Sequence, residues 1–318
     1  MRTVLITGGT GLIGSAVSDF LLREGYRVIV LSRKANPAMV APGTEYAHWD
    51  PAHGLLDDHV LLQADWIVHL AGESLATGRW TPEKKEAMMS SRVSGTRLLR
   101  QSLARQRHHV KALICASGTS YYGDAGDRLL TETDGAGNGL LAGICVRWEE
   151  EASRIRQQGI RVAILRTPPV LAAQSPLLKP LRAFLRLGVA AVPGNGEAWM
   201  SWVHLRDIVR IYAQAISEPA FSGTFNAASP FPVTLGQLST ALARVIKGGF
   251  TVPVYIPALM IRTVAGEKGS ELLKSTRVSA AKLLKTGFEF SFPTIGSALE
   301  DLYGKPQTQA DGSSIVRR

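Results

Sequence analysis

A glycine-rich turn between a short apolar run and a helical pattern constrains the fold of this chain more than any other feature. The apolar run at residues 4–6 is typical of a strand that is buried on both faces of a parallel sheet. Gly8, Gly11 and Gly14 follow at three-residue intervals, and apolar residues then recur at helical spacing as far as Arg23. This order of elements predicts the opening βα unit of a doubly wound α/β sheet.

The spacing of these glycines suits the backbone to a dinucleotide. The first glycine permits a tight turn, the second lets the backbone approach a pyrophosphate, and the third lets the helix pack closely on its strand. The free N–H groups and positive dipole end of the helix favour an anion. A tight turn without a ligand is the alternative. We predict that a dinucleotide is bound by Gly8, Thr10, Gly11, Leu12, Ile13 and Gly14.

The residues after the second predicted strand, 27–31, decide between NAD and NADP. A site for NAD needs Asp or Glu here to accept hydrogen bonds from the ribose hydroxyls. The chain instead has Ser32, Arg33 and Lys34, and a guanidinium can pair with a 2′-phosphate that no carboxylate repels. We therefore predict that Ser32 and Arg33 bind NADP(H). The alternative is that Arg33 and Lys34 are solvated loop charges.

A third buried strand is predicted within residues 66–73, where it ends in a glycine turn. Ligands of doubly wound sheets bind at the carboxyl ends of the strands. The residues expected to line the cofactor cleft here are Leu70, Ala71, Gly72 and Glu73. His69 lies within the strand, so we expect a hydrogen-bonded core histidine. Arg92, in a helix predicted over 82–99, can face either the cleft or solvent.

A cluster of hydroxyl groups follows the strand predicted at residues 111–116. Such groups can hydrogen-bond a reacting carbonyl or hydroxyl and pass protons, whereas the alternative is a polar turn. The candidate catalytic residues are Ser117, Thr119, Tyr121 and Tyr122. In the helix predicted over 140–157, we expect Trp148 on the apolar face and the three glutamates at 149–151 largely in solvent.

Composition and charge narrow the class of function. The chain is 45% hydrophobic and 19% charged, as globular proteins are, and no apolar run reaches the ~18 residues of a membrane span. The net charge of +10 comes without a Lys/Arg block or a basic strand with interleaved aromatic residues. We interpret it as a basic surface with an anion-binding cleft, and we expect neither a nucleic-acid nor a membrane partner.

The two cysteines and the N-terminus indicate the expected compartment. Cys115 and Cys145 form no C-x-x-C pair, so neither a disulfide scaffold nor a cysteine metal site is expected. The N-terminus enters the first strand at once, without the pattern of a signal peptide. We therefore expect a cytoplasmic protein.

The regular alternation of strands and helices loosens after about residue 170. We predict a Rossmann-type nucleotide-binding domain at 1–170, to which residues 200–228 return, and a smaller α+β substrate domain at 171–303. His204 and Asp207 are expected to hold the second domain to the first. The polar tail at 304–318 is expected to be disordered.

The chain resembles an extended short-chain dehydrogenase/reductase of the NAD(P)-dependent epimerase/dehydratase type. More narrowly, it is similar to the nucleotide-sugar epimerase-like subgroup, which has its own C-terminal region and generally no assigned substrate. The resemblance implies an active site between the two domains, hydride transfer from a sugar carbon to the nicotinamide, and often a homodimer. The matching stretches are 6–14, 70–73, 91–99, 116–124, 145–149, 202–207 and 277–288.

The sequence departs from the catalytic pattern that this resemblance implies. The family uses a tyrosine base, a lysine four residues later whose charge lowers the pKa of the tyrosine, and a Ser/Thr at the preceding strand end. Here Leu141 and Cys145 stand at the tyrosine and lysine positions, so Cys145 is the residue expected beside the cofactor. Gly118 stands at the hydroxyl position, between Ser117 and Thr119.

Three interpretations remain, because a fold does not determine a function. The chain is an NADP(H)-binding, epimerase-like oxidoreductase that acts on an unassigned small molecule, such as a nucleotide sugar, through other groups. Alternatively, it is a non-catalytic NADP(H)-binding sensor or interaction protein. In the third interpretation it keeps the fold but neither turns over a substrate nor responds to the cofactor.

Overall fold

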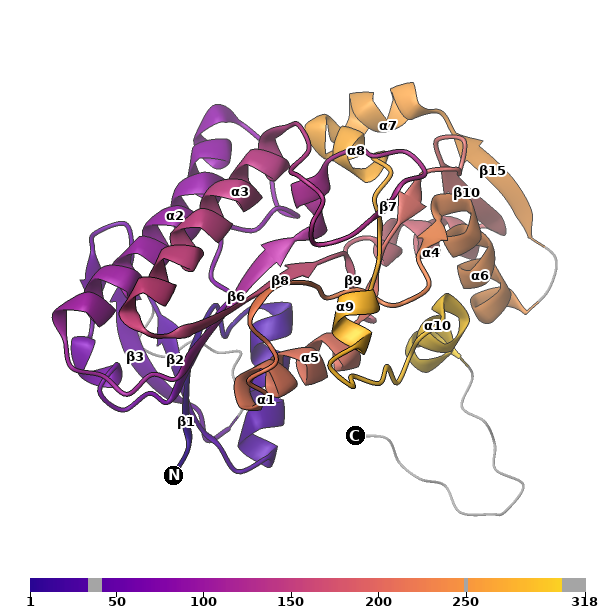
Figure 1. Ribbon diagram of the computed structural model, residues 1–318. Coiled ribbons are helices and arrows are strands. Elements are labelled where there is room, and N and C mark those ends of the chain that lie inside the picture. Colours follow the sequence, from indigo (N-terminus) through magenta and orange to yellow (C-terminus); the bar gives the residue numbers. More distant parts are fainter. Residues whose placement is uncertain (34–41, 249–250, 305–318) are drawn as a thin grey trace, which may run out of the picture.

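An eight-stranded sheet forms the centre of the computed structural model, which describes residues 1–33, 42–248 and 251–304 (Figure 1). Its strands lie in the order β13-β8-β6-β5-β1-β2-β3-β4, and all neighbours are parallel except β3 and β4. In that order the strands are β13 (Gly223–Asn226), β8 (Arg161–Thr167), β6 (Ala112–Gly118), β5 (Trp66–His69), β1 (Thr3–Thr7), β2 (Arg27–Ser32), β3 (Glu45–Asp50) and β4 (Leu55–Leu56). This confirms the predicted doubly wound α/β fold.

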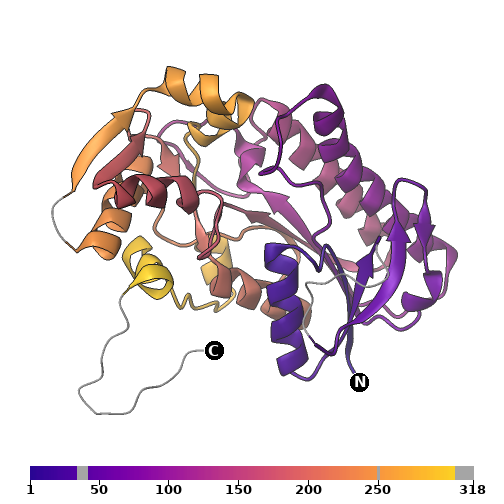
Figure 2. The same ribbon diagram turned by 180° about the vertical axis from the view of Figure 1, so that it is seen from behind.

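Helices cover both faces of this sheet, because alternate residues of each buried strand point to opposite faces. The covering helices are α1 (Leu12–Arg23), α5 (Leu205–Ser217), α2 (Pro82–Arg105) and α3 (Leu140–Ser153). Val4 and Ile6 of β1 share a core with α1 and α5, whereas Leu5 shares the opposite core with α2 and α3. Figure 2 shows α1 on the face turned away from α2 and α3.

A second, smaller lobe is built around its own apolar core, which includes Trp202, Leu238 and Leu299. Its helices are α4 (Leu178–Arg186), α6 (Leu235–Lys247), α7 (Ala258–Ala265), α8 (Glu267–Leu272) and α10 (Ile295–Tyr303). The short α9 (Ala281–Leu284) instead packs against the core of the large sheet through Leu283. The two-stranded pairs are β10 (Val189–Pro193) with β15 (Val252–Ile256), β11 (Trp199–Met200) with β14 (Val233–Thr234), β9 (Val170–Leu171) with β12 (Val203–His204), and β7 (Leu129–Leu130) with β16 (Arg277–Val278). Within the described ranges, no helix is both long and apolar enough to span a membrane.

The chain crosses between the two lobes more than once. After entering the smaller lobe it returns through α5 and β13, and β13 pairs with β8 at the edge of the large sheet. Asp207 at the start of α5 accepts hydrogen bonds from the N–H groups of Ser291 and Phe292, at 2.8 and 3.0 Å. His204 stacks against Phe292, with ring centroids 4.0 Å apart. These two residues therefore fasten the segment before α10 to the returning α5.

Several predicted elements differ in length from those observed. The helix predicted over 82–99 extends to Arg105, and α3 ends at Ser153, continued by the 3-10 helix η3 (Arg154–Gln158). The strand predicted within 66–73 ends at His69. The predicted tail, apart from Gly304, and Lys34 lie outside the described residues.

Candidate cofactor cleft and neighbouring polar network

The glycine turn lies at the carboxyl end of β1. Gly8 has a φ of +70°, a left-handed conformation that residues with a side chain rarely adopt. A Cβ on Gly14 would lie 2.2 Å from the carbonyl oxygen of Gly8, so only glycine allows α1 to pack this closely on the turn. Gly11, the N-cap of α1, has no side chain that could occupy the first N–H groups of the helix. The helix N-terminus is therefore suited to an anion.

A cleft of about 1340 Å³ opens beside this turn. Small-ligand pockets are typically ~300–1,000 Å³, so the cleft is large enough for a dinucleotide. The predicted residues that line it are Gly8, Thr10, Gly11, Ser32, Arg33, Leu70, Ala71, Gly72 and Glu73. Leu12, Ile13 and Gly14 belong to the first turn of α1 and are not among the lining residues.

Two parts of the lining escaped the sequence prediction. They are residues 49–52, at the end of β3, and the α2 residues Ala87, Ser90, Ser91 and Ser94. Asp50 ends β3, which lies next to β2 in the sheet. Its position at the carboxyl end of a strand could have identified it as a residue of the cleft. The serines carried no signal of their own, because only the packing of α2 turns them toward the cleft.

A buried chain of hydrogen bonds holds the turn after β5 beside the glycine turn. The hydroxyl oxygen of Thr7 accepts from the N–H groups of Leu70 and Ala71, at 3.1 and 3.0 Å. The same hydroxyl lies 2.7 Å from Nδ1 of His69, whose Nε2 lies 2.9 Å from the Thr96 hydroxyl. Burial, together with the nearby Arg92 charge, lowers the pKa of His69 to about 3. His69 is thus a neutral core histidine, as expected from the sequence.

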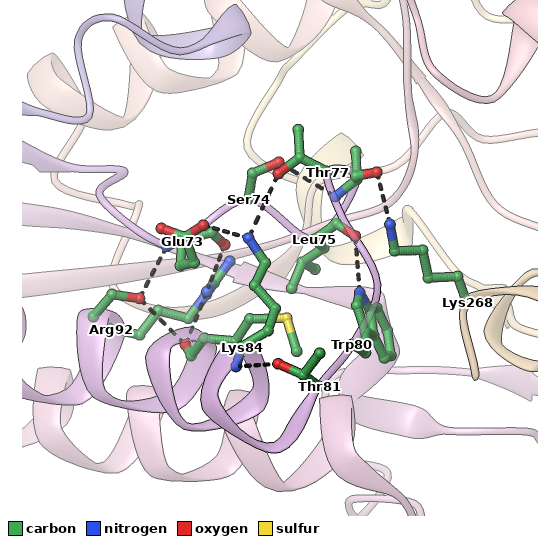
Figure 3. Close-up of polar contacts among 12 residues, drawn as sticks. Glu73, Ser74, Leu75, Thr77, Trp80, Thr81, Lys84, Arg92 and Lys268 are labelled. Atoms are coloured by element: carbon green, nitrogen blue, oxygen red, sulfur yellow. Dashed lines mark hydrogen bonds and ion pairs between the residues drawn. The ribbon is translucent and has the colours of Figure 1, made fainter. Parts of the chain in front are cut away.

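Glu73 forms the next part of the cleft wall, and Arg92 packs behind it (Figure 3). The N–H of Glu73 donates to the hydroxyl of Ser91 at 2.9 Å, and its carboxylate pairs with Lys84. Arg92 Nη1 donates to the carbonyl oxygen of Glu73 at 3.1 Å, so the Arg92 side chain reaches the cleft wall rather than projecting into solvent alone. The adjoining loop also contacts the smaller lobe, where Lys268 of α8 donates to the carbonyl oxygen of Ala76 at 2.9 Å.

Arg33 lies at the end of the cleft formed by β2. Its side chain is exposed, and within the described ranges no carboxylate lies within 4.0 Å of it. Across the cleft, the positive charge of Arg33 helps Lys84 to lower the pKa of Glu73. The guanidinium is therefore available to a ligand anion, while the Glu73 carboxylate is already paired with a lysine.

The predicted catalytic hydroxyls are only partly available for chemistry. Ser117 donates to Glu149 Oε1 at 2.6 Å, and Arg166 pairs with both oxygens of Glu149, at 2.9 and 2.8 Å. Arg166 also donates to the Tyr122 hydroxyl at 2.8 Å, and that hydroxyl donates to Asn226 Oδ1 at 2.7 Å. Burial raises the pKa of Tyr122 to about 12. Ser117 and Tyr122 are thus parts of a buried structural network.

Thr119 and Tyr121 lie outside this hydrogen-bonded network. Thr119 is buried at the start of η2 (Thr119–Tyr122), directly after the end of β6. The Tyr121 ring lies under Arg166, with Cζ 3.4 Å from the ring centroid. Tyr121 also lines a separate hollow of about 430 Å³ over α3. Tyr121 shares that hollow with Glu149 and Glu150, whereas Thr119 is not among its lining residues.

Leu141 and Cys145, which the sequence predicts at the family's tyrosine and lysine positions, are both buried in α3. Cys145 Sγ lies 3.7 Å from the carbonyl oxygen of Gly118. Burial raises the pKa of the Cys145 thiol, so it is neutral at physiological pH. Leu141 is buried in a small apolar cluster with Met88 and Ile144. Neither residue carries the acid–base group that the resemblance implies at its position.

The prediction that the glutamates at 149–151 are largely solvated is wrong for two of them. Glu149 is 8% exposed and Glu151 only 2% exposed. Glu149 pairs with Arg166, whereas Glu151 accepts from Arg100 at 2.7 Å and from Arg154 at 3.0 Å. Each buried carboxylate is therefore compensated by arginine.

Two protein-family models match the chain. The model of the NAD dependent epimerase/dehydratase family matches residues 4–228, which include the glycine turn and the whole large sheet. A domain of unknown function (DUF1731) matches residues 256–302, which include the last helices of the smaller lobe.

Curated relatives and solved structures agree with this match. An epimerase family protein of Mycobacterium bovis is 37% identical over 297 residues, or 93% of this chain and 96% of that protein. The human epimerase family protein SDR39U1, whose structure was solved with NADPH, is 25% identical with a TM-score of 0.83, covering 95% of this chain and 99% of that chain. A nucleoside-diphosphate sugar epimerase of Corynebacterium glutamicum is 31% identical with a TM-score of 0.74, covering 95% of this chain but 58% of that chain.

Proposed function

This chain belongs to the NAD dependent epimerase/dehydratase family, and on that premise we propose that it binds NADP(H) and uses it to oxidise or reduce a small molecule. The observation that carries the proposal is the exposed cation of Arg33, at a cleft position where a site for NAD needs a carboxylate. A nucleotide sugar is the first candidate substrate, because the name of the similar Corynebacterium glutamicum protein describes that activity.

The described residues fit an NADP(H) dinucleotide. The glycine turn leaves no space for a Cβ at Gly8 or Gly14, as a backbone built to approach a pyrophosphate requires. Arg33 and Ser32 line the cleft at the end of β2, which supports binding of a 2′-phosphate there, because a guanidinium can pair with it bidentately. The human relative solved with NADPH supports the same choice.

The two lobes have separate roles in this proposal. Residues 1–170, with 200–228, form the NADP-binding domain, and residues 171–303 form the substrate domain. The hydrogen bond from Lys268 of α8 to the carbonyl oxygen of Ala76 supports a substrate site between them, because it brings the smaller lobe to the loop beside the cleft.

Bound NADPH would supply a hydride, and the chain's own residues would orient the substrate. Thr119 and Tyr121 are the candidates for this task, because Ser117 and Tyr122 are already hydrogen-bonded within the buried network. The usual tyrosine base has no counterpart at Leu141. In reduction the substrate oxygen therefore takes its proton from water, and in oxidation the hydroxyl proton passes to water, rather than to or from a tyrosine–lysine pair.

A second candidate function is a non-catalytic NADP(H)-binding sensor. The observation that favours it is the buried network itself, in which the hydroxyls of Ser117 and Tyr122 stabilise the fold rather than face a substrate. A sensor needs only a cofactor site and a surface that responds to its occupancy.

One experiment separates these functions. Purified protein is mixed with NADPH and a panel of sugar nucleotides and small carbonyl compounds, and the absorbance of the reduced nicotinamide is followed. Turnover that is lost in Thr119→Ala or Tyr121→Phe supports the oxidoreductase. If NADPH instead raises the unfolding temperature without any turnover, the sensor is supported. If the protein shows neither turnover nor protection against unfolding by NADPH, both proposed functions are overturned.

A further inference from the structure

Arg92 brings a positive charge behind the cleft wall, where the Glu73 carboxylate acts on it only from a distance. Its Nη1 donates to two carbonyl oxygens, those of Met88 at 2.9 Å and Glu73 at 3.1 Å. Within the described ranges, Nη1 makes all of the hydrogen bonds of this guanidinium, and no carboxylate lies within 4.0 Å of it. Two nitrogens, Nε and Nη2, therefore keep their donors for another partner.

These two nitrogens lie directly behind Gly72, which lines the cleft. A Cβ on Gly72 would lie 2.8 Å from Cζ of Arg92, 3.0 Å from Nη2 and 3.1 Å from Nε. On its other side, Cζ of Arg92 lies 5.2 Å from the ring of Trp148 in α3. The guanidinium is thus wedged between the cleft wall and α3.

This position is also close to Cys145, which stands at the family's lysine position. The charge of Arg92 acts on the Cys145 thiol and opposes the effect of burial on the thiol's pKa. The neutral thiol itself supplies no charge, so the cation in this part of the site comes from α2 instead of α3. A guanidinium is always protonated in proteins and offers several donors to neighbouring hydroxyls.

We propose that Arg92 supplies a cation to the nicotinamide half of NADP(H) and binds it through the hydroxyls of its ribose. The proposal rests on the proposed binding of NADP(H), but not on turnover. Arg92 is a positioning residue in this role. The competing explanation is that Arg92 only fastens the loop after Gly72 through its bonds to backbone carbonyls.

The test compares two ligands that share one half. NADPH carries both halves of the cofactor, whereas adenosine 2′,5′-bisphosphate carries only the adenine half with its 2′-phosphate. In Arg92→Met we expect the Kd of NADPH to rise about tenfold or more, since one charge-assisted hydrogen bond accounts for that factor, while the Kd of the bisphosphate stays within about twofold. Arg105→Met, at the exposed end of the same helix, is the matched control and should change neither Kd.

A rescue variant separates binding from loop fastening. Adding Cys145→Lys to Arg92→Met returns a cation to the family's lysine position, and we expect it to recover most of the NADPH affinity. Unfolding without ligand reports whether the variants fold, and Arg92→Gln, which also removes the charge but keeps a polar side chain, is used if Arg92→Met does not fold. The proposal would be overturned if Arg92→Met raised the Kd of both ligands or of neither. It would also be overturned if Cys145→Lys did not restore the NADPH affinity. If the wild type binds neither ligand, the proposed function itself fails.

Discussion

Replacing Gly14 by alanine tests the close packing of α1 on the glycine turn. The new Cβ would lie 2.2 Å from the carbonyl oxygen of Gly8, and 2.8 Å from both the carbonyl carbon of Gly8 and Cα of Gly9. A carbon and a carbonyl oxygen in favourable contact lie ~3.3–3.6 Å apart. Either α1 or the turn must therefore move by about 1 Å, because backbone atoms cannot rotate away as a side chain would.

The expected cost follows from this overlap. Overpacking by one carbon typically destabilises a protein by ~1–3 kcal/mol, so we expect Gly14→Ala to lie near the upper end of that range. The displaced turn also changes the positions of the N–H groups proposed to hold the pyrophosphate. The variant should therefore lose NADPH affinity as well as stability.

Gly143→Ala is the matched control, because it makes the same change inside α3. No heavy atom lies within 4 Å of a Cβ at Gly143 apart from its own neighbours and helix backbone. Alanine in this open helical position should stabilise the protein by ~0.4–1 kcal/mol and leave NADPH binding unchanged. Urea unfolding midpoints and fluorescence titration with NADPH measure both effects. Equal stability changes in the two variants, or normal NADPH binding by Gly14→Ala, would refute the reasoning.

Three further substitutions test the buried polar groups. Glu149→Gln leaves the buried Arg166 without its carboxylate, and we expect a loss of ~3–5 kcal/mol in urea unfolding, against little change for the exposed Glu150→Gln. His69 has a pKa of about 3 instead of 6.5, so its contribution to the free energy of unfolding is complete above pH 6.5. As the pH falls from 6.5 toward 3, this contribution is lost at ~1.4 kcal/mol per pH unit. In His69→Asn, the free energy of unfolding should therefore decline less steeply between pH 7 and pH 5 than in the wild type, and an unchanged slope would contradict this account. Asp207→Asn weakens the acceptor of two N–H groups before α10, and hydrogen exchange at 291–292 should become faster; unchanged exchange would mean that this carboxylate does not fasten the segment.

The large sheet could be predicted from the sequence because its signals are local. An apolar run, a glycine turn and helical spacing identify β1 and α1 without any knowledge of the rest of the chain. The end of β5 was harder to place, because the Thr7 side chain accepts from the N–H of Ala71 and shares the N–H of Leu70 with the Thr7 carbonyl oxygen. That partner lies more than sixty residues away in sequence.

The buried charges could not be predicted for the same reason. A run of three glutamates is usually a solvated face, and nothing near Glu149 indicates its partner Arg166 on β8. The pairing of β10 with β15 joins segments about sixty residues apart, and neither segment was recognised as a strand. The role of Arg92 depends on the packing of α2 against α3, which no periodicity reveals.

The most direct test of the central claim compares NADPH with NADH. The account predicts that the wild type binds NADPH at least ~10-fold more tightly, because a charge-assisted hydrogen bond to the 2′-phosphate accounts for that factor. In Arg33→Ala, this preference should largely disappear through weaker NADPH binding, while the NADH affinity changes little. Equal affinities of the wild type for NADPH and NADH would contradict the account.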